Sequence, residues 1–482
     1  MTQILNEPSV FVIFGGTGDL ARRKLLPALA HLFEREDVQK HCRVLGVSSD
    51  TSLDDAAYRE VALKALADAQ ATKQGADALL RALHFQAVER GKGEHFVALS
   101  ERLKHICARC GFPTNYAFYL ALPPNAFPGV VEQLGAAGLN GSPGWSRLVV
   151  EKPFGRDLKS AEELNRVLHA HFRESQIFRI DHYLGKESVQ NLLVFRFANA
   201  IFEALWNRER VHSVEICVAE SLGVGARAGY YDQTGAMRDM LQNHLAQLLA
   251  LVAMEVPASF DADAIRYEKL KVLRSVAPIR CQDVVRAQYA AGDIDGKPVA
   301  GYLEEPGIVA SSQTETFVAL ELFVNTWRFR GVPFYLRTGK RLKRRLTEIV
   351  VRFHDVPVSL FASAGVAMDT ADVLVLRLQP EEGFSLHFDV KAPGSPFSLR
   401  RIPLSFRYGD AFGRMPEAYE TLLLDVLRGD QTLFVHAEEA EQSWRIFTPL
   451  LEAPPPLTRY TAGSWGPAEA ERLGVREVDA WR

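Results

Sequence analysis

The decapeptide RIDHYLGKES, residues 179–188, gathers four side chains that could do chemistry within six positions: Asp181, His182, Tyr183 and Lys186. A solvated strand end that leads into a helix would need no function. If the segment instead turns helical, Lys186 lies four residues beyond His182 and three beyond Tyr183, so the three side chains share one face. We call these three the anion cup, because they offer several hydrogen-bond donors to a doubly charged group. The segment is therefore a candidate binding site for a small anionic molecule.

A second candidate is the glycine turn in VFVIFGGTGDLARRK, residues 10–24. Gly16, Gly18 and Ala21 follow the spacing G-x-G-x-x-A between an apolar run and a helical pattern. Glycines at these positions let backbone amides at the positive end of the helix approach a pyrophosphate. Close packing of strand on helix would also explain them, but the position at the first crossover of the chain favours a dinucleotide site.

A third pattern, HICARC, contains Cys107, two residues beyond His105, and Cys110, five residues beyond it. A zinc or redox site would need two further ligands or a thioredoxin-like setting, and the sequence offers neither. We interpret this C-x-x-C as one face of a helix and expect no metal.

The elements that must position these candidates change character along the chain. Up to about residue 150, apolar runs such as SVFVIF and SRLVVE alternate with helical patterns, which predicts a doubly wound parallel sheet with ligands at the carboxyl ends of its strands. Beyond about residue 178, period-two runs such as HSVEICVAES predict a mainly antiparallel sheet, interrupted by helices. We therefore predict a Rossmann-type α/β domain over residues 1–178 and a large α+β domain over 179–482.

The composition excludes several functional classes. The chain has 482 residues, 47% of them hydrophobic and 24% charged, which is ordinary for a globular protein. A net charge of −3 gives no long-range attraction to nucleic acid or to an anionic membrane. The apolar stretch NHLAQLLALVAM is interrupted by His244 and Gln247, and the N-terminus shows no export signal. Five cysteines do not make a disulfide framework, so we expect the reducing cytoplasm.

Seven blocks then occur in a recognisable order: GGTGDLARRK, YLALPPNAF, EKPFGRDL, RIDHYLGKE, MRDMLQNHLAQ, GVPFYLRTGKRL and LLLDVLRGDQTLFV. From about residue 10 to 466 the chain resembles the glucose-6-phosphate dehydrogenase family, for which RIDHYLGKE is close to a signature. The resemblance implies a Rossmann-type coenzyme domain and a β+α domain whose broad sheet forms a homodimer, in some members a homotetramer. It also implies oxidation of glucose 6-phosphate at C1 to 6-phosphoglucono-1,5-lactone, with hydride transfer to a nicotinamide coenzyme, as the first step of the oxidative pentose phosphate pathway.

This reaction needs a base for the C1 hydroxyl proton while hydride leaves the same carbon. Histidine suits the role because its ordinary pKa lies near neutrality. Taken alone, His244 in MRDMLQNHLAQLL would be interpreted as a satisfied helix histidine. The resemblance instead implies that His244 is the base and that Asp181 orients its imidazole, through a tertiary contact.

The resemblance also implies eight substrate-binding residues: Lys152, His182, Tyr183, Lys186, Glu220, Asp239, Lys340 and Lys343. The anion cup would hold the 6-phosphate, and Glu220 and Asp239 would accept hydrogen bonds from sugar hydroxyls. Lys152 in EKPFG follows a strand at the expected coenzyme edge, and Pro153 after it is a candidate for a cis peptide bond. Lys343 transfers less well than Lys340, because spacing beyond the R-T-G-K motif varies. Asp239 and His244 are five residues apart, about 140° around an α-helix, so they could flank a substrate but not stack.

The coenzyme contacts that the resemblance implies are Gly15, Gly16, Thr17, Gly18, Asp19, Leu20, Lys24, Ser49 and Lys152. NADP is the family default, and NADP-specific members usually carry an arginine just beyond the second strand. This chain has Ser48–Asp50 there, although residues 22–24 offer three cations. Asp50 would repel a 2′-phosphate if it faced the ribose, but it could also begin a helix cap with Ser52 and Asp55. We expect relaxed specificity, with NAD used as well as NADP or preferred.

Two alternatives remain open. A sugar oxidoreductase of the glucose–fructose oxidoreductase type also has E-K-P after a strand, but it would need no anion cup. A catalytically inactive relative that regulates the enzyme would be expected to lose the base, its partner or the glycine turn, and all three are present.

Overall fold

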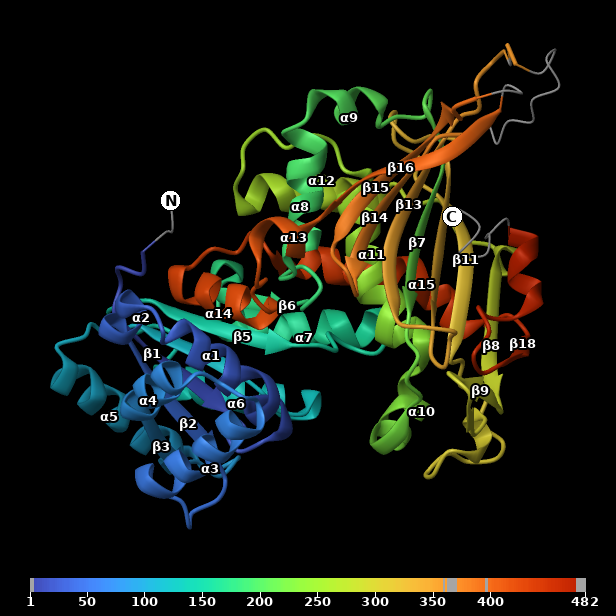
Figure 1. Ribbon diagram of the computed structural model, residues 1–482. Helices are drawn as coiled ribbons and strands as arrows, with labels where there is room; N and C mark the ends of the chain where they lie inside the picture. The colour runs from blue at the N-terminus through green and yellow to red at the C-terminus, as the bar shows by residue number, and fades with distance from the viewer. Residues whose placement is uncertain (1–3, 359, 362–370, 395–397, 474–482) are drawn as a thin grey trace. The chain divides into compact units, whose positions relative to one another are not determined.

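The computed structural model describes residues 4–358, 360–361, 371–394 and 398–473 (Figure 1). Its contacts divide the chain into two compact units. Unit 1 takes the described residues up to Lys186, together with Phe260–Arg266 and Pro416–Glu441. Unit 2 takes the described residues of Glu187–Ser259 and Tyr267–Met415 and those from Gln442 onward. A single domain boundary after residue 178 stays a prediction. By contacts, unit 1 continues to the end of the anion cup and receives two later segments.

Unit 1 is built on a seven-stranded sheet with the order β17-β6-β5-β4-β1-β2-β3. The strands are β1 (Ser9–Phe14), β2 (Cys42–Ser48), β3 (Leu83–Ala87), β4 (Tyr116–Leu120), β5 (Ser146–Glu151), β6 (Ile177–Ile180) and β17 (Phe434–Val435). Strands β1 to β6 are parallel, and only β17 among the paired strands of this sheet runs antiparallel, against β6. The doubly wound sheet expected from the apolar runs is confirmed, and every residue of β1 is buried.

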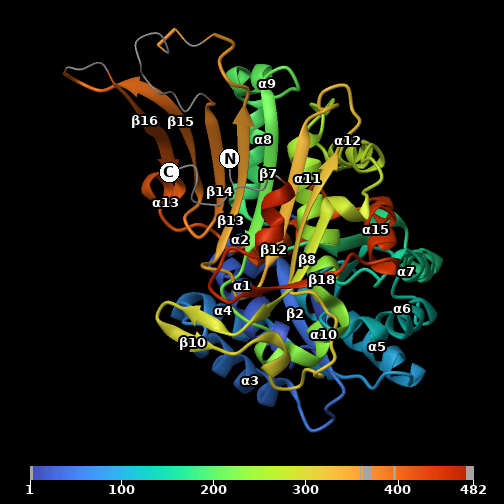
Figure 2. The same ribbon diagram turned by 90° about the vertical axis from the view of Figure 1, so that its right-hand side faces the viewer.

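The helices of unit 1 explain that burial. They are η1 (Ala21–Leu25), α1 (Leu26–Leu32), α2 (Glu36–His41), α3 (Asp55–Asp68), α4 (Lys73–Ala82), α5 (Gly93–Cys110), α6 (Phe127–Ala136), α7 (Leu158–His171) and α14 (Ala418–Arg428). Figure 2 shows α1, α3 and α4 on one side of the sheet and α5, α6 and α7 on the other. Leu422, Val426 and Phe434 from the late segment belong to the same hydrophobic core as β1. Both faces of the parallel sheet are therefore covered, which is why its strands have no polar face.

Unit 2 is built on a nine-stranded sheet with the order β16-β15-β14-β13-β7-β12-β11-β8-β18. The strands are β7 (Val211–Ala219), β8 (Val284–Ala290), β11 (Phe317–Phe323), β12 (Pro333–Gly339), β13 (Leu346–Phe353), β14 (Val373–Gln379), β15 (Gly383–Lys391), β16 (Leu399–Arg407) and β18 (Leu457–Thr461); β9 (Gly292–Ile294) and β10 (Lys297–Val299) form a separate hairpin. Most neighbours in the large sheet are antiparallel, as expected, but β7 runs parallel to β12 and β8 to β18. The parallel pair β7–β12 matters for the site, because its two carboxyl ends meet at one edge.

The remaining helices pack on this sheet or end the chain. They are α8 (Glu187–Phe197), α9 (Ala200–Leu205), α10 (Ala228–Ala236), η5 (Met237–Leu245), α11 (Ala246–Ala253), α12 (Ala262–Arg274), α13 (Tyr408–Phe412) and α15 (Ala437–Glu452). Within unit 2, η5 packs against β12 and α8 against β14. All eight residues of α11 are buried, so its apolar composition serves a protein core. No helix among the described residues is long and apolar enough to cross a bilayer.

Candidate active site

The anion cup forms directly after β6, in unit 1. Residues 181–186 make successive turns rather than an α-helix: Leu184 N–H donates to the Asp181 carbonyl at 3.0 Å, and Lys186 N–H donates to that of Tyr183 at 3.1 Å. The turns still bring the three side chains together. The Lys186 ammonium lies 3.6 Å from the centre of the Tyr183 ring, and the rings of His182 and Tyr183 are 5.0 Å apart. The cup therefore combines a buried lysine, an imidazole and a phenol, with the Tyr183 ring close to both of the other groups.

Asp181 helps to shape that cup. Its carboxylate accepts a hydrogen bond from the backbone N–H of Tyr183 at 2.9 Å, and the residue is almost fully buried. Helix α14 packs closely against the same turn: a Cβ on Gly185 would lie 2.7 Å from the Ala418 carbonyl oxygen. Only glycine allows the helix to approach so closely. The late segment of the chain thus helps to build a site whose side chains come from much earlier.

Lys152 follows β5, and its peptide bond to Pro153 is cis. The preceding residue, Glu151, is partly buried and accepts hydrogen bonds from the hydroxyls of Tyr119 and Tyr419, the latter at 2.9 Å. Burial raises the pKa of Glu151, while these two hydrogen bonds oppose that shift. Burial also raises the pKa of Tyr419, and the carboxylates of Glu151 and Asp181 add to the effect. A buried polar cluster therefore underlies the start of the segment that carries Lys152.

The glycine turn lies at the carboxyl end of β1, where the fold places ligands. Gly15 has a φ of +81°, and a Cβ there would lie 2.2 Å from the Ala121 carbonyl oxygen. A Cβ on Gly16 would lie 2.8 Å from the Tyr58 hydroxyl, which donates to the Gly16 carbonyl at 3.1 Å. A helix begins directly after the turn, at Asp19, and the Arg22 N–H donates to the Gly18 carbonyl at 3.1 Å. The turn thus lies at the positive end of a helix, which fits a dinucleotide pyrophosphate.

The loop after β2 bears on the choice of coenzyme. Asp50 accepts hydrogen bonds from Ser52, at 3.0 Å from its N–H and 2.5 Å from its hydroxyl, and these bonds lower the pKa of Asp50. The cap of α3 is Asp54, whose carboxylate accepts from the N–H groups of Ala56 and Ala57. The idea that Asp50 with Ser52 and Asp55 caps this helix is therefore wrong. Asp50 instead closes its own exposed turn as an anion just beyond the second strand.

The cations expected near the coenzyme already have acidic neighbours in unit 1. The Lys24 ammonium lies 3.1 Å from a carboxylate oxygen of Glu417, and a guanidinium nitrogen of Arg23 lies 3.5 Å from Asp19. All four side chains are largely exposed, so these pairs are weak and can exchange for a ligand.

In unit 2, Lys340 and Glu220 extend from the carboxyl ends of the parallel strands β12 and β7. Gly339 and Ala219 are register partners, so the residues that follow them are neighbours. The Lys340 ammonium lies 2.5 Å from a Glu220 carboxylate oxygen and 5.0 Å from the centre of the Tyr231 ring. Lys340 is only 4% exposed. Lys343, by contrast, is exposed on the following turn, and its role stays a prediction.

Asp239 and His244 lie on η5, which is a π-helix rather than the expected α-helix. A π-helix pairs residues five apart, so it brings Asp239 and His244 toward the same side instead of about 140° apart. The expected separation of about 140°, which assumed an α-helix, is therefore wrong. His244 is 1% exposed, and its backbone N–H donates to the Asn243 side-chain oxygen at 2.6 Å. The helix is buried nearly all round, which suits a histidine that must be held in one place.

Two residues of unit 2 that the sequence did not single out belong to this setting. Tyr231 is buried, and burial raises its pKa well above the usual range, with further contributions from the carboxylates of Asp239, Glu315 and Glu220. Tyr231 thus lies among the predicted sugar-binding carboxylates, and Glu315 lies close by. Neither belongs to a block that resembles the family, and the only available signal was that Tyr231 precedes the MRDM block.

The structure therefore gathers the predicted residues into two sets. Unit 1 holds the glycine turn, Lys152, Asp181 and the anion cup, and unit 2 holds Glu220, Asp239, His244 and Lys340. The cysteine pattern takes no part in either set. Cys107 and Cys110 lie on α5 with free thiols, and burial raises the pKa of Cys107.

Comparison with known proteins covers nearly the whole chain. Residues 12–191 match the family model described as the glucose-6-phosphate dehydrogenase NAD binding domain, and residues 193–482 match the C-terminal domain of the same family. Glucose-6-phosphate 1-dehydrogenase of Aggregatibacter actinomycetemcomitans is 43% identical over 99% of this chain and 97% of its own. The Rhizobium meliloti enzyme of the same name is 45% identical over 98% of both chains.

Solved structures agree with these matches. A glucose-6-phosphate dehydrogenase in complex with its substrate glucose 6-phosphate superposes with a TM-score of 0.91 at 34% identity, covering 99% of this chain and all of the other. The Mycobacterium avium glucose-6-phosphate 1-dehydrogenase superposes with a TM-score of 0.83 at 35% identity, over 97% of each chain.

Proposed function

The chain belongs to the glucose-6-phosphate dehydrogenase family, and from this premise we propose which of its residues perform the reaction. The reaction is the oxidation of glucose 6-phosphate at C1 to 6-phosphoglucono-1,5-lactone, which opens the oxidative pentose phosphate pathway. When bound at the glycine turn, the nicotinamide dinucleotide supplies the hydride acceptor.

His244 acts as the base. Its imidazole takes the proton of the C1 hydroxyl as hydride leaves the same carbon, so that neither a free alkoxide nor a carbocation has to form. Asp181 orients that imidazole and stabilises its cation, as carboxylates do for other catalytic histidines. The burial of His244 on a helix supports the first assignment, and the burial of Asp181 beside the anion cup supports the second.

The anion cup binds the 6-phosphate. The observation that carries this assignment is the buried Lys186 ammonium, held 3.6 Å from the Tyr183 ring with His182 beside it. Lys186 is nine-tenths buried, so its ammonium is shielded from bulk water, and charge-assisted hydrogen bonds to a doubly charged phosphate are strong in such a setting. Lys152 and Lys340 contact the substrate, with Glu220 and Asp239 accepting from the sugar hydroxyls. Lys343 is retained as a weaker contact.

The test of this function compares two substrates. The purified chain is expected to oxidise glucose 6-phosphate with a kcat/KM at least about a thousandfold above that for free glucose, because the phosphate contacts are charge-assisted. Equal rates with both sugars would instead favour the glucose–fructose oxidoreductase type of reaction, and no turnover of either would favour an inactive regulatory relative.

For the coenzyme, we propose that NAD is used together with NADP or in preference to it. Thr17, Gly18, Asp19, Leu20 and Ser49 join the two glycines and Lys24 as contacts. Asp50 supports the proposal, because its exposed carboxylate stands where an NADP-specific site needs a cation. Steady-state kinetics with each coenzyme decides the point, and a hundredfold or greater preference for NADP would contradict it.

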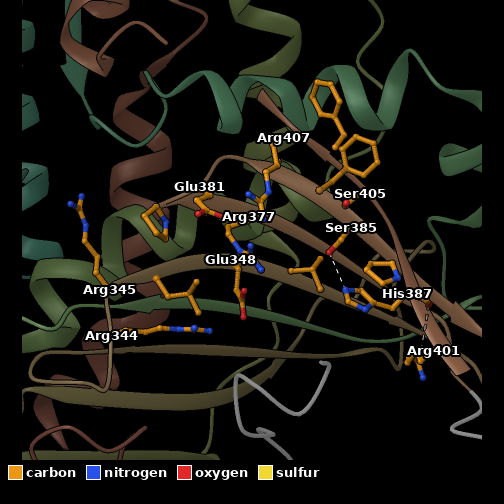
Figure 3. Close-up of a pocket in the computed structure, with 17 residues that line it drawn as sticks. Arg344, Arg345, Glu348, Arg377, Glu381, Ser385, His387, Arg401, Ser405 and Arg407 are labelled. Atoms are coloured by element: carbon orange, nitrogen blue, oxygen red, sulfur yellow. Dashed lines mark hydrogen bonds and ion pairs between the residues drawn. The ribbon is translucent and has the colours of Figure 1, made fainter. Parts of the chain in front are cut away.

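We propose that the chain forms a homodimer, or a homotetramer built from such dimers, across the large sheet. A pocket of about 630 Å³ lies over β13–β16 (Figure 3), lined by alternate residues of neighbouring strands with both signs of charge, among them Arg377, Arg401 and Glu348. On the end strand β16, Leu404 is 62% exposed. An end strand with exposed apolar side chains on one face and a charged hollow on the other suits a second copy of the chain. Sedimentation of Leu404→Asp against Leu63→Asp, an exposed leucine of α3, should show dissociation only for the former.

The proposed compartment is the cytoplasm. All five cysteines are free thiols, as expected in a reducing environment, and two of them, Cys110 and Cys281, are partly or fully exposed. Fractionation of the source cells with an activity assay tests this.

A further inference from the structure

Glu315 joins the helix that carries the base to the edge of the large sheet. Glu315 lies just before β11. The backbone carbonyl of the next residue, Thr316, accepts a hydrogen bond from the backbone N–H of Lys340 at 2.9 Å. The backbone carbonyl of Glu315 accepts from the N–H of Ala236 at 3.0 Å, and the Glu315 carboxylate accepts from the N–H of Met237, also at 3.0 Å. Two successive N–H groups at the start of η5 are thus held by one residue of the sheet.

The chain turns sharply at the same place. Gly235 has a φ of +71° inside the junction between α10 and η5, and a Cβ on it would lie 2.4 Å from a carboxylate oxygen of Glu315. The carboxylate therefore occupies the space that any other residue at position 235 would need. Gly235 and Glu315 together set the point where η5 begins.

Glu315 is costly to bury, so its position needs a reason. It is 5% exposed, and burial raises its pKa, while the N–H of Met237 and the charges of Arg286 and Arg238 oppose that shift. The nearest guanidinium nitrogen of Arg286 lies 3.8 Å away, too far for a strong hydrogen bond. The hydrogen bond from the Met237 N–H is therefore shorter than the contact of the carboxylate with Arg286.

We infer that Glu315 is a positioning residue for the reaction: by fixing the start of η5 against the sheet edge, it places Asp239 and His244 relative to Lys340 and Glu220. This inference rests on the role of His244 proposed above. Glu315 acts through the helix, so it is not a catalytic residue. A helix start that shifts by an ångström would move the base off the C1 hydroxyl while leaving the anion cup of unit 1 intact.

The test separates this role from simple stabilisation by three substitutions at one site. Glu315→Gln keeps an oxygen that can accept from Met237 N–H, so kcat should stay within about threefold of the unmodified enzyme. Glu315→Ala removes the acceptor, and we expect kcat to fall by about tenfold or more while the KM for glucose 6-phosphate changes by less than about threefold. Glu315→Asp keeps the charge but shortens the reach, and its kcat should lie at least about threefold below that of Glu315→Gln.

Asp261→Ala provides the matched control. Asp261 accepts from the N–H of Ala264 near the start of α12 and is not one of the proposed site residues. Its loss should lower the thermal midpoint but leave kcat within about twofold.

A folded Glu315→Ala enzyme with kcat within threefold of the unmodified one would overturn the inference. If Glu315→Ala does not fold, the comparison is between the other two variants. A kcat of Glu315→Asp equal to or above that of Glu315→Gln would overturn the inference, because the charge of residue 315, rather than its hold on the helix start, would then determine kcat. Failure of the proposed function looks different, since the unmodified chain itself would then be inactive or His244→Ala would retain full kcat.

Discussion

The Lys340 ammonium and the Glu220 carboxylate are paired at 2.5 Å at the carboxyl ends of two parallel strands. Both residues are proposed to contact the substrate, so the position of one substrate contact is tied to that of the other. The pair is pre-organised by the β7–β12 register, in which Glu220 N–H also donates to the Gly339 carbonyl at 2.9 Å. Because Lys340 is nearly fully buried, its ammonium has little access to water, and Glu220 gives it a close anionic partner.

The first prediction concerns the coupling of that pair. Glu220→Gln and Lys340→Met should each lower kcat/KM, and the double variant should lose less than the sum of the two losses. A coupling free energy above about 1 kcal/mol is expected, because removing either partner leaves the other charge unpaired in a buried site. A cycle of kcat/KM values measures it. Additive losses, within about 0.5 kcal/mol, would mean that the pair does not act as a unit in the reaction.

The second prediction concerns the base. His244→Ala should lower kcat by about 10²- to 10⁴-fold while the KM for glucose 6-phosphate changes little, because the imidazole moves a proton and does not grip the phosphate. Single-turnover kinetics with saturating substrate and either coenzyme measures the loss. Asp181→Asn should reduce the same step, since the imidazolium that forms would lose a stabilising charge.

The third prediction concerns the anion cup. Lys186→Ala should raise the KM for glucose 6-phosphate by about tenfold or more with a smaller change in kcat, because one charge-assisted contact to the phosphate is lost. Turnover of free glucose, however slow, should not change. If Lys186→Ala lost mainly kcat and His244→Ala mainly affinity, the two roles would have been assigned the wrong way round.

Much of unit 1 could be predicted from local sequence. The strands SVFVIF and SRLVVE are mostly apolar because helices cover both faces of a parallel sheet. The glycine turn could be predicted from the spacing of its residues after the first of these strands. The late return of the chain to this sheet could not be predicted. Strand β17 has two residues, too few to show a period, and its pairing with Arg179 and Ile180 is a purely tertiary choice.

The candidate site was predictable to the extent that it lies in contiguous blocks. RIDHYLGKE places the anion cup, and the strand ends place Lys340 and Glu220. The π-helix was not predictable, because Met237, Met240, Leu241 and Leu245 recur at the spacing of an ordinary α-helix. Glu315 was missed for a related reason: a carboxylate that caps a helix 78 residues earlier leaves no local pattern.

The fourth prediction concerns Gly15. Gly15→Ala should lower stability by at least about 1 kcal/mol and weaken coenzyme binding, because φ is positive there and the added Cβ would meet the Ala121 carbonyl oxygen. Gly129→Ala, on α6, is the matched control. A Cβ on Gly129 would have no atom within 4 Å, so the substitution should stabilise by about 0.4–1 kcal/mol and leave coenzyme binding unchanged. Thermal unfolding and coenzyme titration by fluorescence measure both effects.

The fifth prediction concerns acid stability and the support of β6. Glu174 accepts from Arg179 at 2.6 Å, and its second carboxylate oxygen lies 2.7 Å from His169. Burial alone would raise the pKa of Glu174, but the charge and hydrogen bond of Arg179, together with His169 and His436, outweigh it and lower the pKa to about 2. A carboxyl whose folded pKa lies below its unfolded value of about 4.5 stabilises the fold above pH 4.5 and loses that contribution as the pH falls toward 2.

Glu174→Gln should therefore be less stable than the unmodified protein at pH 6, by no more than roughly 3 kcal/mol, and the difference should shrink as the pH falls from about 4.5 toward 2. Thermal midpoints measured across this range provide the comparison. Glu163→Gln is the control, because Glu163 also pairs with an arginine, Arg166, but does so in full exposure on α7, where solvent screens the pair. The stability difference for Glu174→Gln could instead stay constant from pH 6 to pH 3. This result would show that the contact with Arg179 does not depend on the ionised carboxylate of Glu174. The position of β6 would then depend on its pairing with β17 and β5.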